Sequence, residues 1–123
     1  MDTTKDTTQQ LLDTIVSGIQ EKKGYDIVII DLSAIDGAIT KYFVICQGNS
    51  PIQVDAIAGE VADQCREKLH EKPVSCVGLE QATWVAIDFV DAIVHIFVPE
   101  ARGFYDLEHL WDDAPQTVIP NLD

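Results

Sequence analysis

Two short runs of β-branched and aromatic residues, 84–89 and 92–98, lie next to each other and are separated only by a turn-like segment. Runs of this composition predict two strands that pair as an antiparallel hairpin. With a loop of either two or four residues, the register divides the side chains between two faces. One face is wholly apolar, and we expect it to be core. It carries Val85, Ile87, Phe89, Val94, Ile96 and Val98.

The other face of the hairpin mixes aromatic rings with polar groups. Trp84 and Phe97 contribute rings, His95 an imidazole and Asp88 a carboxylate. This mixture is typical of a surface that meets another protein. A single histidine in a strand more often packs or hydrogen-bonds than catalyses, and no nucleophile lies in register with His95. We therefore interpret this face as a candidate docking surface.

The chain before the hairpin alternates helix and strand signals. They predict a helix over 6–23, strands over 25–32 and 41–47, a helix from Ser50 to about Lys72, and a strand over 74–77. Gly24 is placed to end the first helix, and Ser50 to cap the second, with Pro51 at its first position. A strand, a long helix and another strand form a crossover unit, so the strands flanking the second helix should run parallel. We expect a single α/β (α+β) domain with a mixed sheet of about five strands.

After the hairpin, Pro99 should end strand pairing, and the next apolar residues predict one helix folded back on the sheet. These apolar residues are Phe104, Leu107, Leu110 and Trp111. Residues 113–123 contain two prolines and show no periodicity, which predicts a mobile tail after a domain over 1–112.

The charge balance disfavours nucleic acid as a direct partner. Eight Lys and Arg against 21 Asp and Glu give a net charge of −13, which repels phosphate backbones and attracts basic surfaces. If the protein works near RNA, we expect it to dock on a basic protein. The alternative is that the acidic charge serves only solubility. No apolar run approaches a membrane span and the N-terminus does not have the pattern of a signal peptide, so we expect a cytoplasmic protein that binds no membrane.

The motifs that would suggest chemistry are weak. Residues 48–50, between a strand and a helix, match either an anion site or ordinary turn and cap chemistry, and the second interpretation is favoured. Magnesium-dependent nucleotidyl transfer would need paired carboxylates, and no Asp-x-Asp occurs. The histidines and the three cysteines, Cys46, Cys65 and Cys76, have no metal-site spacing, and we expect all three thiols to be reduced and buried. We expect no metal, no cofactor and no catalysis.

Several separated motifs occur in a distinctive order and spacing over about residues 8–112. They are Tyr42-Phe43-Val44-Ile45-Cys46, Gly48-Asn49-Ser50, Gln53-Val54, Trp84-Val85, Asp88, Asp91, Val94-His95-Ile96-Phe97, Glu100 with Arg102, Phe104-Tyr105, Leu107-Glu108 and Leu110-Trp111. Together they resemble the ribosomal silencing factor family, RsfS or iojap-like. The resemblance implies a fold similar to nucleotidyltransferases without the catalytic carboxylates.

The resemblance also implies a function. Members of that family bind the large-subunit ribosomal protein numbered fourteen on the intersubunit face, and so block joining with the small subunit. The indole that matches Trp84 lies at this contact. We therefore expect a steric repressor of translation that docks through one mixed face. The expected docking residues are Trp84, Asp88, His95, Phe97, Tyr105 and Glu108.

Two residues depart from the family pattern. Lys41 stands where the family usually has aspartate, and Val90 stands where it usually has glycine in the hairpin turn. Val90 argues against a tight type I′ turn, because a β-branched residue tolerates positive φ poorly. Two alternatives stay open: a small nucleotidyltransferase-like enzyme that uses the turn at 48–50 for phosphate, and a homodimeric adaptor whose hairpin face mates with itself.

Overall fold

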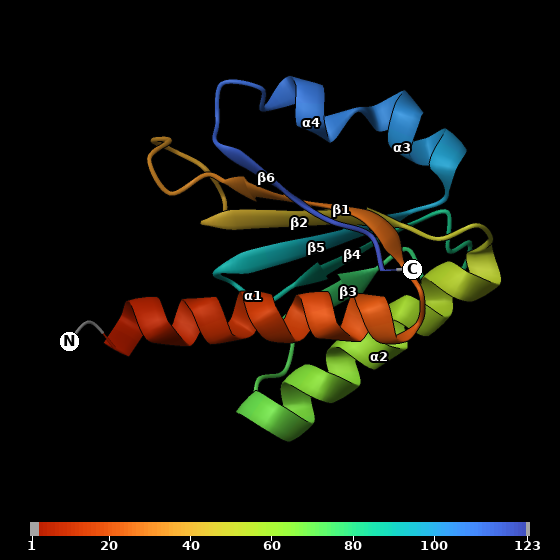
Figure 1. Ribbon diagram of the computed structural model, residues 1–123, viewed down its shortest axis with the longest axis horizontal. Coiled ribbons are helices and arrows are strands. Elements are labelled where there is room, and N and C mark those ends of the chain that lie inside the picture. The colour runs from red at the N-terminus through yellow and green to blue at the C-terminus, as the bar shows by residue number, and fades with distance from the viewer. Residues whose placement is uncertain (1–2, 123) are drawn as a thin grey trace.

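The computed structural model describes residues 3–122, and the side chains from residue 7 onward, as three layers with a sheet in the middle (Figure 1). Helices α1 and α2 cover one face of the sheet, and the short helices α3 and α4 lie over the other. In chain order the elements are α1 (Thr3–Glu21), β1 (Tyr25–Asp31), β2 (Tyr42–Gln47), α2 (Pro51–Leu69), β3 (Ser75–Val77), β4 (Trp84–Asp88), β5 (Ala92–Phe97), α3 (Pro99–Tyr105), α4 (Leu107–Leu110) and β6 (Gln116–Ile119).

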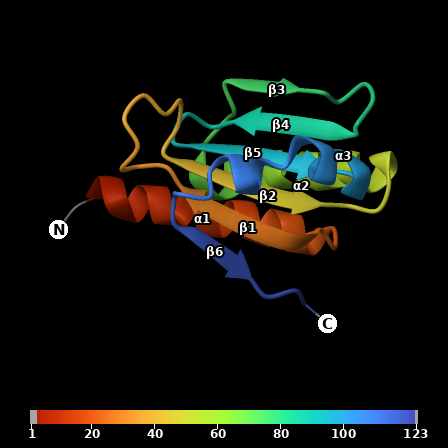
Figure 2. The same ribbon diagram turned by 90° about the horizontal axis from the view of Figure 1, so that it is seen from above.

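The sheet is mixed, as predicted, and over the described residues it has six strands in the order β3-β4-β5-β2-β1-β6 (Figure 2). Strands β2 and β5 pair in parallel, and every other neighbouring pair is antiparallel. Strand β3 therefore runs in the same direction as β2, which confirms the predicted crossover. The two strands are not neighbours, because β4 and β5 lie between them.

The hairpin has the predicted register. Trp84 lies opposite Phe97, and the register continues to the opposite end, where Asp88 faces Ile93. The predicted core face packs under α1 and α2. Its strand residues Val85, Ile87, Val94 and Ile96 have no exposed surface. Each such side chain stabilises the fold by about 1.5–3 kcal/mol, so this face anchors the domain.

The second helix begins as predicted. Ser50 has an extended backbone and its side chain accepts a hydrogen bond from the Gln53 N–H, while Pro51 takes the first helical position. The helix ends at Leu69, earlier than predicted, because His70 adopts a left-handed conformation with φ 55°. Its backbone N–H closes the last turn by donating to a carbonyl of that turn.

The end of the first helix uses a different residue from the one predicted. Lys23, not Gly24, has the left-handed backbone, with φ 63°. Gly24 is needed for packing instead, because a Cβ atom there would lie 2.5 Å from Cγ2 of Ile19.

The prediction of a mobile tail over residues 113–123 is wrong for its described part. Residues 116–119 form β6, which pairs with β1 from Ile27↔Ile119 to Ile30↔Gln116. The Asn121 side chain extends this contact by accepting from the Asp26 N–H and donating to its carboxylate. Strand β6 forms because it pairs with backbone N–H and C=O groups of β1 that would otherwise lie at an open sheet edge. Such backbone pairing does not require apolar side chains, so the hydrophobic periodicity of the sequence does not reveal it.

The prediction of one helix after Pro99 is also wrong, because Asp106 adopts φ 47° and separates α3 from α4. The break changes the direction of the helix axis, so the four apolar residues no longer share one stripe. Leu107 and Trp111 pack on the sheet, whereas Phe104 and Leu110 are 82% and 67% exposed.

Two expectations on composition can be compared with the fold. Cys46 and Cys65 are buried free thiols, as expected, but Cys76 is exposed because β3 is an edge strand. Within residues 3–122, no helix has both the length and the apolar character needed to cross a lipid bilayer.

Candidate protein-docking site

The sheet face beneath α3 and α4 holds a connected group of rings. The ring of Trp84 lies 5.2 Å from that of Phe97 and 4.3 Å from that of Tyr105, measured between centroids. His95 meets the Phe43 ring edge-on at 4.5 Å. These spacings are those of favourable aromatic contacts. The hairpin and helix α3 therefore share one aromatic cluster.

Exposure varies steeply across this cluster. Phe97 has no exposed surface and His95 is 7% exposed, so both support the site from below and neither reaches a partner. Trp84 is half-buried, Tyr105 is 46% exposed and Phe104 is 82% exposed. We call these last three residues the aromatic rim. The predicted hairpin face is thus covered by its own chain, and only its edge is open.

Sequence reasoning missed Phe104 as a surface residue. Its apolar character and spacing favoured a core position, and the break at Asp106 that turns it outward has no strong sequence signal. The ring centroids of Phe104 and Tyr105 lie 5.1 Å apart, with an angle of 86° between the ring planes. The aromatic rim therefore runs from the half-buried Trp84 through Tyr105 to the largely exposed Phe104.

His95 orients the indole. The Trp84 Nε1–H donates to Nδ1 of His95 over 3.1 Å. Nδ1 therefore accepts, and the imidazole is neutral. Burial lowers the pKa of His95 to about 4, which keeps this acceptor available at neutral pH. His95 is a positioning residue for Trp84.

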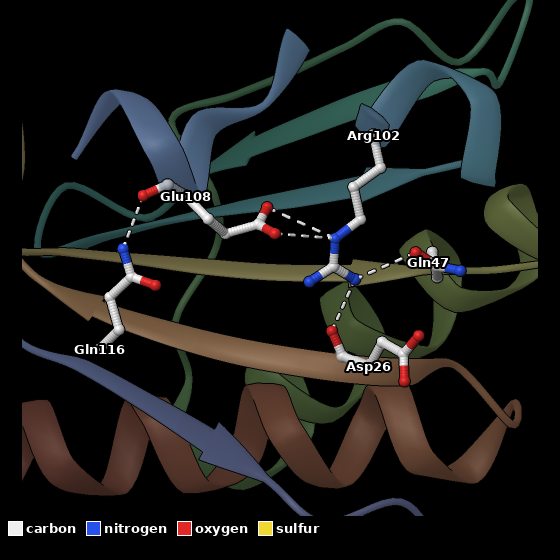
Figure 3. Close-up of polar contacts among 5 residues, drawn as sticks. All are labelled: Asp26, Gln47, Arg102, Glu108 and Gln116. Atoms are coloured by element: carbon white, nitrogen blue, oxygen red, sulfur yellow. Dashed lines mark hydrogen bonds and ion pairs between the residues drawn. The ribbon is translucent and has the colours of Figure 1, made fainter. Parts of the chain in front are cut away.

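Arg102 ties the two short helices to the sheet (Figure 3). Its Nη1 donates to the Asp26 carbonyl at 2.6 Å and to the Gln47 side chain at 3.2 Å, and its Nε donates to Glu108 at 3.4 Å. Gln116 in turn donates to the Glu108 carbonyl at 2.7 Å. We call these five residues the clasp. Glu108, a predicted docking residue, is therefore paired with Arg102 and only partly exposed.

Asp88, another predicted docking residue, stabilises the hairpin turn. Its carboxylate accepts from the Val90 N–H at 2.8 Å, and the Asp91 N–H donates to the Phe89 carbonyl at 3.0 Å. This i→i+2 bond and a Val90 φ of 76° match a γ-turn. The prediction that the turn is not type I′ is confirmed, since a type I′ turn needs positive φ at both central residues and only Val90 has it. Val90 nevertheless adopts the positive φ that a β-branched residue tolerates poorly.

The other departure, Lys41, forms a surface ion pair with Asp91 at 3.7 Å. Both side chains are almost half exposed, so the pair adds at most about 1 kcal/mol. Lys41 lies at the turn end of the hairpin, away from the aromatic rim.

The turn at residues 48–50 uses its backbone donors internally. The Gly48 N–H donates to the Phe97 carbonyl at 3.0 Å, and the Asn49 N–H donates to the Gln53 side chain at 2.7 Å. Ser50 caps the helix, so the turn-and-cap interpretation is confirmed. Among the described residues, no three His, Cys, Asp or Glu side chains come close enough to hold one metal ion.

Comparison with known proteins identifies relatives along nearly the whole chain. The family model described as "Ribosomal silencing factor during starvation" matches residues 5–123. Ribosomal silencing factor RsfS of Halalkalibacterium halodurans is 40% identical over 115 residues, which cover 93% of this chain and 96% of the relative. RsfS of Bacillus subtilis is 38% identical, with 87% and 89% covered. A crystal structure of a Chromobacterium violaceum protein superposes with a TM-score of 0.80 at 30% identity, covering 85% of each chain.

Proposed function

This chain belongs to the ribosomal silencing factor family, and we propose that it silences large ribosomal subunits by binding their basic ribosomal protein fourteen. Membership confirms the resemblance stated from the motifs, and the fold agrees with that of solved relatives. The binding partner and the steric mechanism are our proposal, which rests on the geometry of the docking site.

The observation that carries the proposal is the aromatic rim on a strongly acidic molecule. Aromatic residues at the centre of an interface commonly supply most of its binding energy. The chain around the rim adds exposed carboxylates, at Glu100 and Asp106. With a net charge of −13, this surface is complementary to a basic protein and repels naked RNA.

The proposed mechanism needs no chemical step. The rim docks on the basic protein, and the bulk of the domain then occupies space that the small subunit requires. The rival interpretation, an enzyme that holds phosphate at residues 48–50, has less support because two backbone amides of that turn donate within the protein.

Phe104→Ala tests the rim, because this side chain is 82% exposed and its loss should leave folding stability nearly unchanged. We expect binding to purified large subunits to weaken by about 2 kcal/mol, roughly 30-fold, as for an aromatic hot spot. Ile39→Ala is the matched control, since Ile39 is 80% exposed in the loop before β2, at the other end of the sheet. Equal binding by both variants would remove the rim from the interface.

Subunit joining provides the functional measurement. We expect the unmodified protein to reduce the formation of whole ribosomes from purified subunits in a sedimentation gradient, without added nucleotide. Raising the salt concentration should slow its association more than it speeds dissociation. Failure to bind large subunits, or inhibition that appears only with nucleotide, would refute the proposed function.

A further inference from the structure

A groove beside Trp84 has no assigned occupant. It has a volume of about 440 Å³ and runs from β3 along the β3–β4 connection to Trp84. Leu79 and Glu80 line it together with Trp84. The groove is therefore continuous with the aromatic rim, although its walls come from a different part of the chain.

The groove wall is held in one conformation. Gly78 adopts φ 94°, and a Cβ atom there would lie 2.1 Å from the Trp84 carbonyl oxygen, so only glycine fits. The Ala82 N–H donates to the Gly78 carbonyl at 2.9 Å and closes the loop. A loop fixed in this way loses little conformational entropy when a ligand binds.

The neighbouring rings leave part of the indole uncovered. The Phe97 and Tyr105 rings lie 5.2 Å and 4.3 Å from Trp84 but only 6.2 Å from each other. That separation is too short for Trp84 to be sandwiched between them. The two rings therefore approach from neighbouring directions and do not enclose the indole. Trp84 is half-buried and is one of the residues that line the groove.

The charge of the groove is unbalanced. Glu80 is its only charged lining residue, is exposed, and has no ion-pair partner within residues 3–122. Glu80 and Trp84 line the same groove, and a carboxylate and an indole together can bind a planar cation by pairing and stacking. Guanidinium fits this combination better than ammonium, because it is flat, weakly hydrated and donates in pairs.

We propose that this groove takes one arginine side chain of the basic partner, with the guanidinium stacked on Trp84 and paired with Glu80. The inference rests on the proposed function for the identity of the partner, but not for the chemistry of the groove. It makes Glu80 a specificity-determining residue.

The first test compares Glu80→Gln with Glu21→Gln in binding to purified large subunits. Each variant removes one negative charge from an exposed carboxylate. Glu21 is a suitable control because it ends α1, far from the groove on the opposite side of the sheet. We expect Glu80→Gln to weaken binding at least tenfold and Glu21→Gln less than twofold, with unchanged thermal unfolding for both. Equal effects would mean that only the long-range field matters, and would overturn the arginine site.

The second test needs no ribosome and so separates the two proposals. N-acetyl-arginine amide is titrated into the isotope-labelled protein, with the neutral isostere N-acetyl-citrulline amide as control. We expect saturable shifts of the Trp84 indole N–H and the amides of residues 78–83 with arginine, and none with citrulline or in Glu80→Gln. Shifts without subunit binding would refute only the proposed function. Absent or scattered shifts would overturn the groove assignment.

Discussion

Arg102→Ala tests the contact network that holds α3 and α4 over the sheet. The Arg102 side chain is 11% exposed and donates to groups on β1, β2 and α4. We expect its removal to lower the free energy of unfolding by about 3 kcal/mol and to loosen residues 99–111.

The magnitude follows from what the substitution leaves behind. The Asp26 carbonyl and the Gln47 amide oxygen each lose a donor. Asp26 is exposed, so water replaces its donor at little cost, whereas the part-buried Gln47 oxygen loses about 1 kcal/mol. Glu108 loses its counterion, and breaking a fully buried pair costs about 3–5 kcal/mol. Glu108 is 29% exposed, so water compensates part of the loss, and the total stays near the lower end of that range.

Urea unfolding followed by tryptophan fluorescence and by circular dichroism measures the change. Arg66→Ala is the control, because Arg66 pairs with Asp63 and Glu67 on the exposed face of α2 and should cost less than about 0.5 kcal/mol. Combining Arg102→Ala with Glu108→Ala should cost less than the sum of the two single changes. If the free energy of unfolding of Arg102→Ala lies within about 0.5 kcal/mol of that of the unmodified protein, the clasp does not hold the two helices on the sheet.

Three further predictions use backbone strain and burial. Val90→Gly should stabilise the protein by about 1 kcal/mol in urea unfolding, because relief of positive-φ strain exceeds the entropy that glycine adds to the unfolded chain; destabilisation would refute the strain. Gly78→Ala should cost at least about 3 kcal/mol and Gly37→Ala about 1, since both have positive φ but only Gly78 faces a backbone atom; similar costs would contradict this geometry. The pKa of His95, about 4, lies below its ordinary 6.5, so the unfolded state binds the proton first and stability should fall by roughly 3 kcal/mol from about pH 6.5 to pH 4. His95→Gln should remove this part of the pH dependence, and an unchanged slope would show that other groups cause it.

The parts of the fold that the sequence predicts are those specified locally. Alternation of side chains settles the hairpin register, because a slip of one residue would move every core side chain to the other face. Ser50 and Pro51 mark the start of α2 through their own backbone preferences. In each case a few neighbouring residues carry both the signal and the stabilising contact.

The parts that it does not predict depend on contacts between distant segments. Strand β6 has few apolar residues and exists because β1 supplies backbone partners about 90 residues earlier in the chain. The positive φ at Lys23 occurs at a residue with no left-handed preference. Aspartate tolerates this conformation better, but it occurs in helices as well, so Asp106 alone does not mark the break, and tertiary packing selects both. Periodicity contains no information about such choices.

The candidate site combines both kinds of specification. The strand pattern correctly places Trp84, His95 and Phe97 on one face, but it does not say whether another element covers that face. Arg102 holds α3 and α4 over this face by hydrogen bonds to Gln47 and Asp26, which lie 55 and 76 residues away in the sequence. The same two helices bury His95 and Phe97 and leave Phe104 exposed to solvent. Candidate docking residues therefore have to be sought at the uncovered edge of this face, where Trp84 joins the aromatic rim to the groove that Glu80 lines.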